Sequence, residues 1–228
     1  MGNLYIFFIS AIKVKMNEKY AELLGLMAGD GCLSRSGGHY IIYIAGHKID
    51  DLDYHEKITK DLFKTIFEKD VKIGFRKDQL CLFIRFSDKK IFEELAKYLP
   101  IGFKYEKLKI PSEVLVQKEY FFAFVRGVVD TDGCVVFSKQ HKTYRYYPRI
   151  EITSKSKEFL LSISLELKKY GFYTSVSHKG NMAYRLEIPG YKNLKRWMES
   201  IGFSNQKHLE KIKGLLPDPL RLRAGSNR

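Results

Sequence analysis

Residues 23–32 read LLGLMAGDGC, and residues 125–134 read VRGVVDTDGC. Aligning the two segments places Asp30 on Asp132, 102 residues later. Both segments, with the residues before them, are apolar almost all round, which predicts a buried helix. An Asp-Gly pair closes each segment, and Gly31 is typical of a position where a helix stops in a left-handed conformation, as is the glycine after Asp132. The chain therefore contains two copies of one buried helix that ends in an acid.

A second repeat supports the duplication. IGFKYEK at 101–107 matches IGFSNQK at 201–207, 100 residues later. Two different motifs that recur at nearly one offset indicate a duplicated unit rather than a solenoid. The predicted domains are an N-terminal extension (1–15), an N-terminal half (16–115), a C-terminal half (116–216) and a basic tail (217–228).

Each half is predicted to contain the same elements in the same order, which gives an α+β fold. They are a motif helix (18–30 and 119–132), a strand (40–45 and 145–153), a helix (52–67 and 157–170), a hairpin (71–77 with 80–87, and 172–178 with 183–188), a closing helix (90–99 and 191–201) and a further short helix after each IGF segment.

Composition points to a nucleic-acid partner. The 228 residues hold 40 Lys and Arg against 26 Asp and Glu, a net charge of +14, together with 15 Tyr and 16 Phe. Basic and aromatic residues together favour a phosphate polymer over a lipid surface. The three cysteines suggest no disulfide framework, and no stretch is long enough to span a membrane. We therefore expect an intracellular protein (cytoplasm or nucleoid, or an organelle in a eukaryote) without a membrane partner.

The two motif helices are expected to pack on each other at a pseudo-two-fold axis. Gly25, Ala28, Gly29 and Gly127 are small enough to let the helix backbones approach closely. An aspartate at the end of each helix faces the negative end of the dipole, and two such acids repel each other. A bound divalent cation would relieve that repulsion, and oxygen donors with open water positions suit Mg²⁺. The plainer interpretation is a pair of Asp-Gly turns.

These residues resemble the LAGLIDADG homing endonucleases. The nine-residue motif corresponds to 23–31 and to 125–133, and the resemblance extends over about residues 16–216. It implies two pseudo-symmetric αββαββα halves, each with an antiparallel sheet, that form a DNA-binding saddle. The second aspartate of the family motif binds metal and falls on Asp30 and Asp132. Ala28 replaces the first aspartate in one copy, whereas the other keeps Asp130, for which we expect a capping or structural role.

The resemblance also implies supporting residues around the metal. A polar or basic side chain at the end of the first long strand orders water in the family, and His47 and Lys155 match that place. A lysine after the closing helix looks like Lys107 and Lys207. The plain alternative for each is a solvated surface charge. The predicted catalytic residues are Asp30, Asp132, His47, Lys155, Lys107 and Lys207, and the predicted metal ligands are Asp30, Asp132, Gly29 and Thr131.

Strand alternation predicts a basic face on each sheet, because every second side chain points the same way. Arg85 and Arg185 are expected at equivalent positions in the two halves. The predicted DNA-binding residues are Lys72, Arg76, Arg85, Arg145, Tyr147, Arg149 and Arg185.

The sequence thus predicts a site-specific endodeoxyribonuclease that hydrolyses both strands of a long double-stranded DNA site with Mg²⁺, for which Mn²⁺ can substitute. One chain supplies both halves, so it is expected to act as a monomer and to be intron-encoded. Two alternatives stay open: a maturase that binds intron RNA, and a noncatalytic DNA-binding regulator on the same fold.

Overall fold

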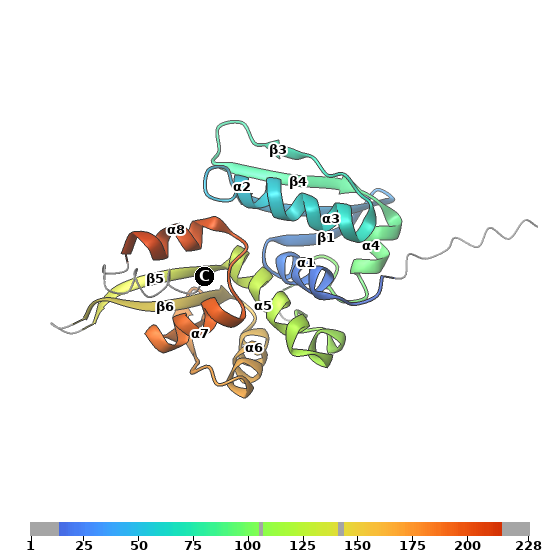
Figure 1. The fold of residues 1–228 in the computed structure, drawn as a ribbon. Coiled ribbons are helices and arrows are strands. Elements are labelled where there is room, and N and C mark those ends of the chain that lie inside the picture. Colours follow the sequence, from blue (N-terminus) through green and yellow to red (C-terminus); the bar gives the residue numbers. More distant parts are fainter. Residues whose placement is uncertain (1–13, 105–106, 141–143, 216–228) are drawn as a thin grey trace, which may run out of the picture.

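The N-terminal half forms one four-stranded antiparallel sheet with helices packed on it (Figure 1). The computed structural model describes residues 14–104, 107–140 and 144–215. In this half the elements are α1 (Glu18–Gly29), β1 (Gly31–Ser36), β2 (His39–His47), α2 (Leu52–Tyr54), a π-helical segment (His55–Thr59), α3 (Lys60–Phe67), β3 (Ile73–Phe75), β4 (Cys81–Ser87), α4 (Lys89–Leu95) and a 3-10 helix (Ser112–Val116). The strand order is β1-β2-β4-β3.

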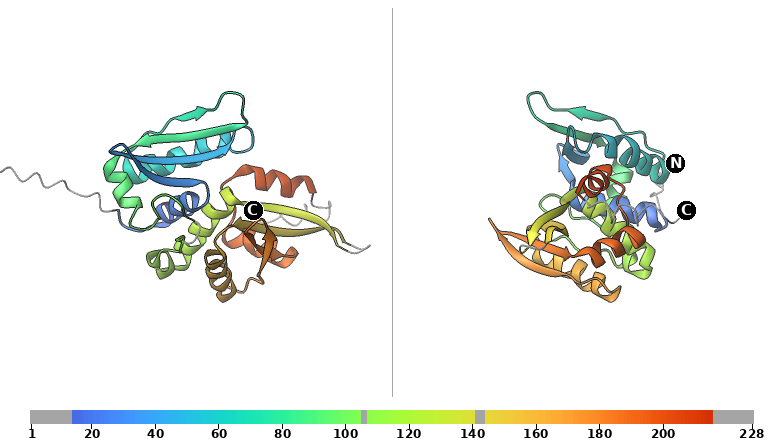
Figure 2. Two further views of the ribbon diagram at one scale, coloured as in Figure 1. Left: turned by 180° about the vertical axis from the view of Figure 1, so that it is seen from behind. Right: turned by 60° about the vertical axis from the view of Figure 1, so that its left-hand side comes forward.

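The C-terminal half repeats this arrangement (Figure 2). Its elements are α5 (Lys118–Asp132), β5 (Gly133–Gln140), β6 (Tyr144–Ser154), α6 (Lys157–Lys169), β7 (Ser175–Gly180), β8 (Ala183–Pro189), α7 (Tyr191–Ser200) and α8 (Gln206–Leu215). The strand order is β5-β6-β8-β7. The α+β class and the two αββαββα halves are therefore confirmed. The short strand directly after each motif, β1 or β5, had no separate place in the element prediction made from patterning alone.

The two motif helices pack on each other so closely that only glycine fits at the contact. A methyl group on Gly25 of α1 would lie 2.0 Å from the carbonyl oxygen of Phe124. A methyl group on Gly127 of α5 would lie 2.3 Å from the carbonyl oxygen of Glu22. Figures 1 and 2 show α1 and α5 side by side between the two sheets. The expected packing of the motif helices through small residues is confirmed.

The glycine after each motif aspartate has a different reason from the one expected. Gly133 has φ −100° and ψ 166°, and Gly31 is also outside the left-handed region. A Cβ on Gly31 would instead lie 2.5 Å from Cα of Met27, and one on Gly133 would lie 2.5 Å from the carbonyl oxygen of Val129. The prediction of a left-handed conformation was therefore wrong. These glycines instead let the chain fold back against its own helix as the strand begins.

Strand pairing gives the correspondence between the halves. Gly31 pairs with Ile44, and Gly133 pairs with Ile152, so β2 matches β6 at an offset of 108 residues. The strand pairs align β4 with β8 at an offset of 102 residues. Equivalent places on the two sheets can therefore be compared residue by residue.

This register corrects one expectation. At the β4-to-β8 offset, Arg85 corresponds to Glu187, and Arg185 corresponds to Phe83. The two arginines lie on the same face of their sheets but two residues apart along the strand, so they are not equivalent. Arg85 and Arg185 are 100 residues apart, which is the offset of the IGF segments, whereas β4 and β8 align at an offset of 102.

Two features expected from composition can be compared with the structure. Cys32, Cys81 and Cys134 are free thiols, as the sequence suggested. None of the helices in residues 14–104, 107–140 and 144–215 combines the length and the hydropathy needed to cross a lipid bilayer.

The α1–α5 contact predicts a sharp effect of one methyl group. Gly25→Ala forces the two backbones apart, and overpacking of this kind costs about 1–3 kcal/mol of unfolding free energy. Gly214→Ala on α8 is the matched control, because nothing lies within 4 Å of a Cβ there. We expect urea titrations to show a lower unfolding free energy for Gly25→Ala and an unchanged one for Gly214→Ala. Equal stability of both variants would contradict the close approach.

Candidate functional site

The two motif aspartates end the paired helices. Asp132 is the last residue of α5, and Asp30 caps α1, with its N–H donating to the Leu26 carbonyl at 3.0 Å. The Asp30 carbonyl accepts from the N–H of Ala45 on β2 at 3.2 Å. Backbone bonds to the helix on one side and the sheet on the other thus hold Asp30 in place.

Each acid has a raised pKa. Burial, followed by the charges of Asp132 and Asp51, raises the pKa of Asp30 to about 7, although Lys104 and Lys207 act in the opposite direction. Partial removal from water also raises the pKa of Asp132, although the Asp132 side chain still reaches solvent. The pair therefore either retains a proton or attracts a cation.

Lys104 supplies a cation at this place. Its ammonium group donates to the carbonyl oxygens of Ala28 at 2.8 Å and Gly31 at 2.9 Å, and also to that of Gly29. Burial lowers the pKa of Lys104, while the nearby aspartate charges act to raise it. The unpaired carbonyls at the end of α1 are thus satisfied by an ammonium group rather than by water.

Sequence reasoning selected Lys107 for this role, and the structure places Lys107 elsewhere. Lys107 is exposed, whereas the lysines whose charges lower the pKa of Asp30 are Lys104 and Lys207. Lys104 was missed because the matched IGF segments align it with Ser204. The internal repeat therefore pointed away from it, and only the fold of the 101–104 segment brings it to the end of α1.

Asp51 links the two halves beside the motif aspartates. Its carboxylate accepts from the Lys207 ammonium at 2.7 Å, the Asn205 amide at 3.0 Å and the His47 backbone N–H at 2.8 Å. Burial alone would raise the pKa of Asp51, but these hydrogen bonds outweigh it and lower the pKa. Lys207, a predicted site residue, is therefore held near Asp30 by a charged carboxylate that the sequence did not single out.

His47 and Lys155 occupy equivalent positions, as expected, because they are separated by the β2-to-β6 offset of 108 residues. The His47 ring pairs through Nδ1 with the Asp50 carboxylate at 3.0 Å. Lys155 is exposed and directly follows β6. The structure thus places both at the end of the long strand that the resemblance specified.

Gly29 and Thr131, the remaining predicted metal ligands, lie against each other across the helix contact. A Cβ on Gly29 would lie 2.0 Å from Thr131 Oγ1. The Thr131 hydroxyl donates to the Gly127 carbonyl at 2.9 Å, so its side chain is used inside α5. Only the backbone carbonyls of Gly29 and Thr131 are suited to bind metal, and the Gly29 carbonyl already accepts from Lys104.

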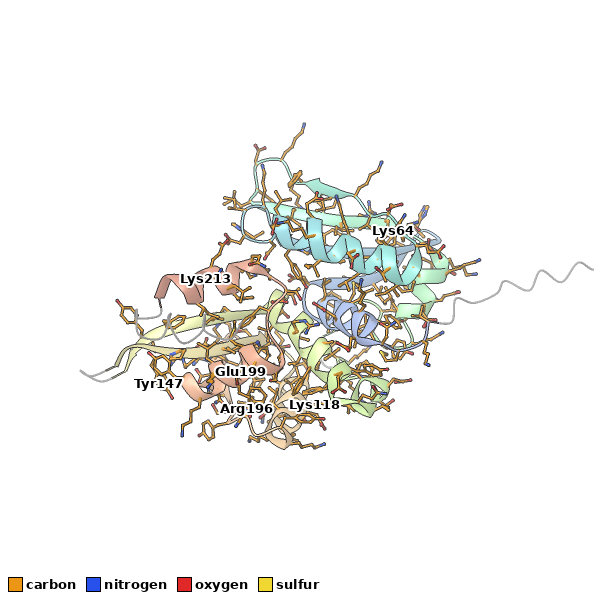
Figure 3. All side chains as sticks on the ribbon, viewed as in Figure 1. Lys64, Lys118, Tyr147, Arg196, Glu199 and Lys213 are labelled. Atoms are coloured by element: carbon orange, nitrogen blue, oxygen red, sulfur yellow. The ribbon has the colours of Figure 1, made fainter. Side chains whose placement is uncertain are left out.

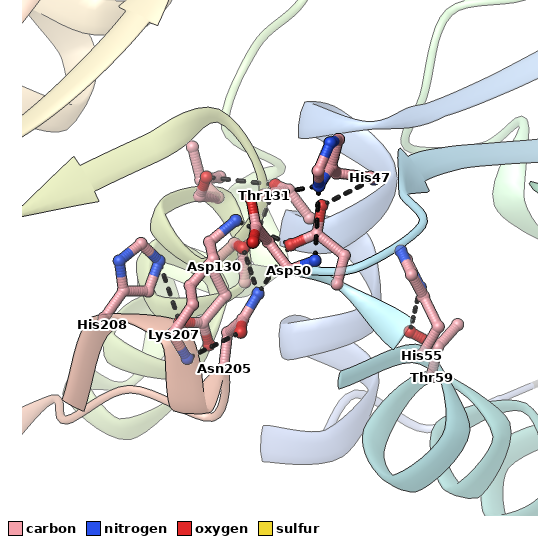
Figure 4. Close-up of polar contacts among 12 residues, drawn as sticks. His47, Asp50, His55, Thr59, Asp130, Thr131, Asn205, Lys207 and His208 are labelled. Carbon is pink, nitrogen blue, oxygen red and sulfur yellow. Dashed lines mark hydrogen bonds and ion pairs between the residues drawn. The ribbon is translucent and has the colours of Figure 1, made fainter. Parts of the chain in front are cut away.

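Asp130 is fully buried behind this site (Figure 4). Its Oδ2 accepts from the Ser204 N–H at 2.8 Å, and its Oδ1 lies 3.8 Å from Nε2 of His208. Burial raises the pKa of Asp130 to about 8 and lowers that of His208 to about 3. The two meet as neutral groups near pH 7, and Asp130 anchors the segment before α8, in keeping with its expected structural role.

A second polar contact fastens the same segment to α1. Arg126 of α5 binds the Glu22 carboxylate at 2.6 Å and donates to the Ile201 carbonyl at 3.0 Å. The Ser204 hydroxyl donates to the other Glu22 oxygen at 2.5 Å. The segment that leads into α8, and so to Lys207, is thus fixed by contacts to both motif helices.

The predicted DNA-binding residues lie on strands of both sheets or, for Lys72 and Arg76, directly beside β3. Lys72, Arg76 and Arg85 of the N-terminal half are exposed. Tyr147, labelled in Figure 3, is half-buried, with its ring edge-on to Tyr191 at the start of α7. The other three are Arg149 and Arg185, which pair with glutamates, and Arg145, whose side chain lies outside the described part of the structure.

Removal of the Lys104 charge should destabilise the protein in EDTA. Lys104→Met leaves buried carbonyls without a donor, which costs about 1–3 kcal/mol of unfolding free energy. Lys107→Met, the matched control on an exposed side chain, should stay within about 0.5 kcal/mol of the unaltered chain. Guanidinium titrations measure both. A loss of equal size in the two variants would contradict the placement of Lys104.

The raised pKa of Asp130 predicts a pH-dependent stability. Between the unfolded pKa near 3.9 and the folded pKa of about 8, the folded protein holds a proton that the unfolded chain has lost. Stability therefore falls as pH rises through this window, and Asp130→Asn removes that fall. Relative to the unaltered chain, Asp130→Asn should gain up to about 1 kcal/mol per pH unit between pH 5 and 8.

Urea titrations across this range measure the gain, with Glu158→Gln on the exposed face of α6 as the control that should not change with pH. A stability difference for Asp130→Asn that is the same at pH 5 and pH 8 would show that Asp130 is ionised throughout.

Solved structures share this fold. I-DmoI in complex with DNA and Mn matches with a TM-score of 0.58 and 22% identity, over 81% of this chain and 96% of that chain. The N-terminal LAGLIDADG domain of DUF199/WhiA matches with a TM-score of 0.58 and 20% identity, over 87% of each chain. At these identities the likeness concerns the fold alone.

In sequence, this chain matches parts of longer proteins. Replication factor C small subunit of Methanocaldococcus jannaschii is 28% identical over 212 residues, which are 89% of this chain and 10% of that protein. Uncharacterized protein MJ0314 of the same organism is 25% identical over 179 residues, 76% of this chain and 62% of that protein. The chain thus spans a tenth of the first relative and less than two thirds of the second.

A family model described as the LAGLIDADG-like domain matches residues 119–202. This match runs from α5 through α7, and the N-terminal half repeats the same motif helix and sheet order. The match and the repeated elements lead to one conclusion: the C-terminal half contains a LAGLIDADG-like domain, and the N-terminal half repeats its motif helix and strand order, so the chain carries two pseudo-symmetric motifs.

Proposed function

We propose that this protein is a metal-dependent endodeoxyribonuclease that acts as a monomer and cuts both strands of double-stranded DNA. The observation that carries the proposal is the place of Asp30 and Asp132 at the ends of paired helices, with raised pKa values and two lysines close by. Acids held together in this way favour a divalent cation, which stabilises charge on a phosphodiester that is being hydrolysed.

The donors at this place fit a hard cation. They are carboxylate and carbonyl oxygens, which suit Mg²⁺ or Mn²⁺. The described residues contain no group of three or more His, Cys, Asp or Glu that could hold a metal. Mg²⁺ suits such an incomplete set, because it keeps several waters and takes phosphate oxygens from a substrate. Asp30 and Asp132 would hold the metal, together with the carbonyls of Gly29 and Thr131.

The neighbouring side chains have distinct roles in this proposal. Lys104 and Lys207 place positive charge beside the two acids, where a phosphate in reaction gains negative charge. His47 and Lys155 stand at the strand ends, where they can bind water or a phosphate oxygen. Asp51 keeps Lys207 in position through its 2.7 Å contact.

The two sheets would bind DNA on either side of the paired aspartates, as a saddle. Exposed Lys72, Arg76 and Arg85 supply cations on one sheet, and the net charge of +14 favours a polyanionic partner. I-DmoI, which has the same fold, was solved in complex with DNA and Mn. This supports the proposal that the present protein binds DNA together with a divalent metal. The intron-encoded context and an intron RNA partner stay predictions from the sequence.

A second candidate function is noncatalytic DNA binding. The observation in its favour is Lys104, whose ammonium donates to the Gly29 carbonyl and already compensates the negative helix end. A protein in which that ammonium is permanent would bind DNA through its sheets and leave the backbone intact. Cleavage in the presence of metal separates the two functions.

The deciding test is cleavage of DNA from the protein's own locus with the intervening reading frame removed. With Mg²⁺ or Mn²⁺ we expect double-strand cuts at one place, and none in EDTA. Asp30→Asn and Asp132→Asn should each lower the cleavage rate at least about 100-fold. Asp61→Asn, on the exposed surface of α3, is the matched control and should cut at the unaltered rate.

Binding to this DNA without cutting in either metal would reject the nuclease and favour the noncatalytic function. Cleavage that survives both substitutions would show that the chemistry lies elsewhere in the chain.

A further inference from the structure

The sheet faces that carry Tyr43 and Glu151 differ in charge at matched positions. In the N-terminal half, Tyr43 on β2 is opposite Arg85 on β4. The equivalent pair in the C-terminal half is Glu151 on β6 opposite Glu187 on β8. A neutral aromatic residue and a cation in one half are thus replaced by two carboxylates in the other.

The carboxylates of the C-terminal sheet hold its two arginines in one cluster, which we call the Arg–Glu ladder (Arg149, Glu151, Arg185 and Glu187). Arg149 Nε lies 3.2 Å from Glu151 Oε1, and Arg185 Nη1 lies 3.5 Å from Glu151 Oε2. Arg185 Nε lies 3.1 Å from Glu187 Oε1. The ladder has two positive and two negative charges, so its net charge is zero.

Burial makes this neutralisation effective. The Glu151 side chain is only 7% exposed, whereas those of Arg149 and Arg185 are 21% and 30% exposed. Ion pairs away from water are screened less by salt than pairs at the surface. Glu151 therefore keeps its ion pairs with the two arginines at moderate salt.

The N-terminal sheet has a different surface. Arg76 donates to the Tyr43 hydroxyl at 3.2 Å, and the Tyr43 ring stacks on Phe83 with centroids 6.1 Å apart. Arg85 is exposed on this face, and Lys72, directly before β3, is exposed as well. At the strand positions of this face that the structure describes, there is no carboxylate.

We propose that the two sheets bind DNA by different means: the N-terminal sheet binds phosphates with its cations, whereas the Arg–Glu ladder weakens phosphate binding by the C-terminal sheet and orders two arginines for contact with base edges. This inference rests on the proposed DNA-binding function. It assigns Glu151 and Glu187 as the residues that set the difference.

The physical argument concerns counterions. A free arginine or lysine that neutralises a phosphate releases a condensed counterion, which makes binding depend on salt. An arginine already paired with a carboxylate offers little net charge to a phosphate, and the carboxylates repel the backbone. A guanidinium fixed by carboxylates can still donate two parallel hydrogen bonds to a guanine edge, and it loses less conformational entropy on binding.

The first test removes only the negative charges of the ladder. Binding of a fluorescent duplex of random sequence is measured by anisotropy in EDTA, between about 50 and 200 mM salt. Glu151→Gln with Glu187→Gln should bind this duplex more tightly than the unaltered chain. It should also steepen the dependence of log K on log salt by about 1–2 units, because each freed arginine contributes about 0.9.

The matched control is Glu119→Gln with Glu158→Gln, which makes the same change in net charge at exposed positions on α5 and α6. We expect the salt slope of the control to stay that of the unaltered chain. Equal steepening in both double variants would overturn the inference, because the effect would then come from net charge alone. No steepening in the ladder variant would overturn it as well.

A second comparison removes arginines from one sheet or the other and measures the salt slope of each variant. It keeps the inference testable if the first variant fails to fold. Arg76→Gln with Arg85→Gln should flatten the salt slope by about 2 units, and Arg149→Gln with Arg185→Gln by less than half as much. Equal flattening by the two pairs would show that both sheets bind phosphate alike. Thermal unfolding of each variant confirms that the fold is intact.

These binding measurements are separate from the cleavage test. A protein that binds DNA with a steep salt slope and does not cut would reject the nuclease while the ladder comparison still stands. Failure of the unaltered chain to bind any duplex would overturn both proposals.

Discussion

The close approach of α1 and α5 is the constraint on which the rest of the molecule depends. Gly25 and Gly127 let the two backbones touch, and Gly29 receives the Thr131 side chain. Because both helices end at the same place, their aspartates lie close together, and the charge of Asp132 raises the pKa of Asp30. The site is therefore a direct consequence of helix packing, and so is its demand for positive charge.

Positive charge reaches that site from the chain itself. Lys104 comes from the segment after α4, and Lys207 comes from the first turn of α8, where Asp51 of the other half holds it. These two lysines explain how two neighbouring acids with raised pKa values are tolerated without metal. They also bear on the choice between a nuclease and a noncatalytic DNA-binding protein, because a lysine ammonium can either assist a metal ion or take its place.

The pseudo-symmetry is closer in the strand order of the two halves than in their side chains. Strand order and register repeat, yet Tyr43 and Arg85 correspond to Glu151 and Glu187. A duplicated fold needs only its apolar residues and glycines to keep the core and the helix contact. The exposed faces are free to differ, so the two halves of one chain can meet the two halves of an asymmetric ligand.

The sequence by itself determined the duplicated architecture, the paired motif helices and the two aspartates, because apolar periodicity, small residues and Asp-Gly stops are local signals. The resemblance to a known family placed His47 and Lys155 at matched strand ends. Tertiary structure alone decided that Lys104 reaches the site, that Asp51 holds Lys207, and that Arg85 and Arg185 are not equivalent. The physical reason is that a long side chain and a strand register are fixed by neighbours far apart in the chain, which no local pattern encodes.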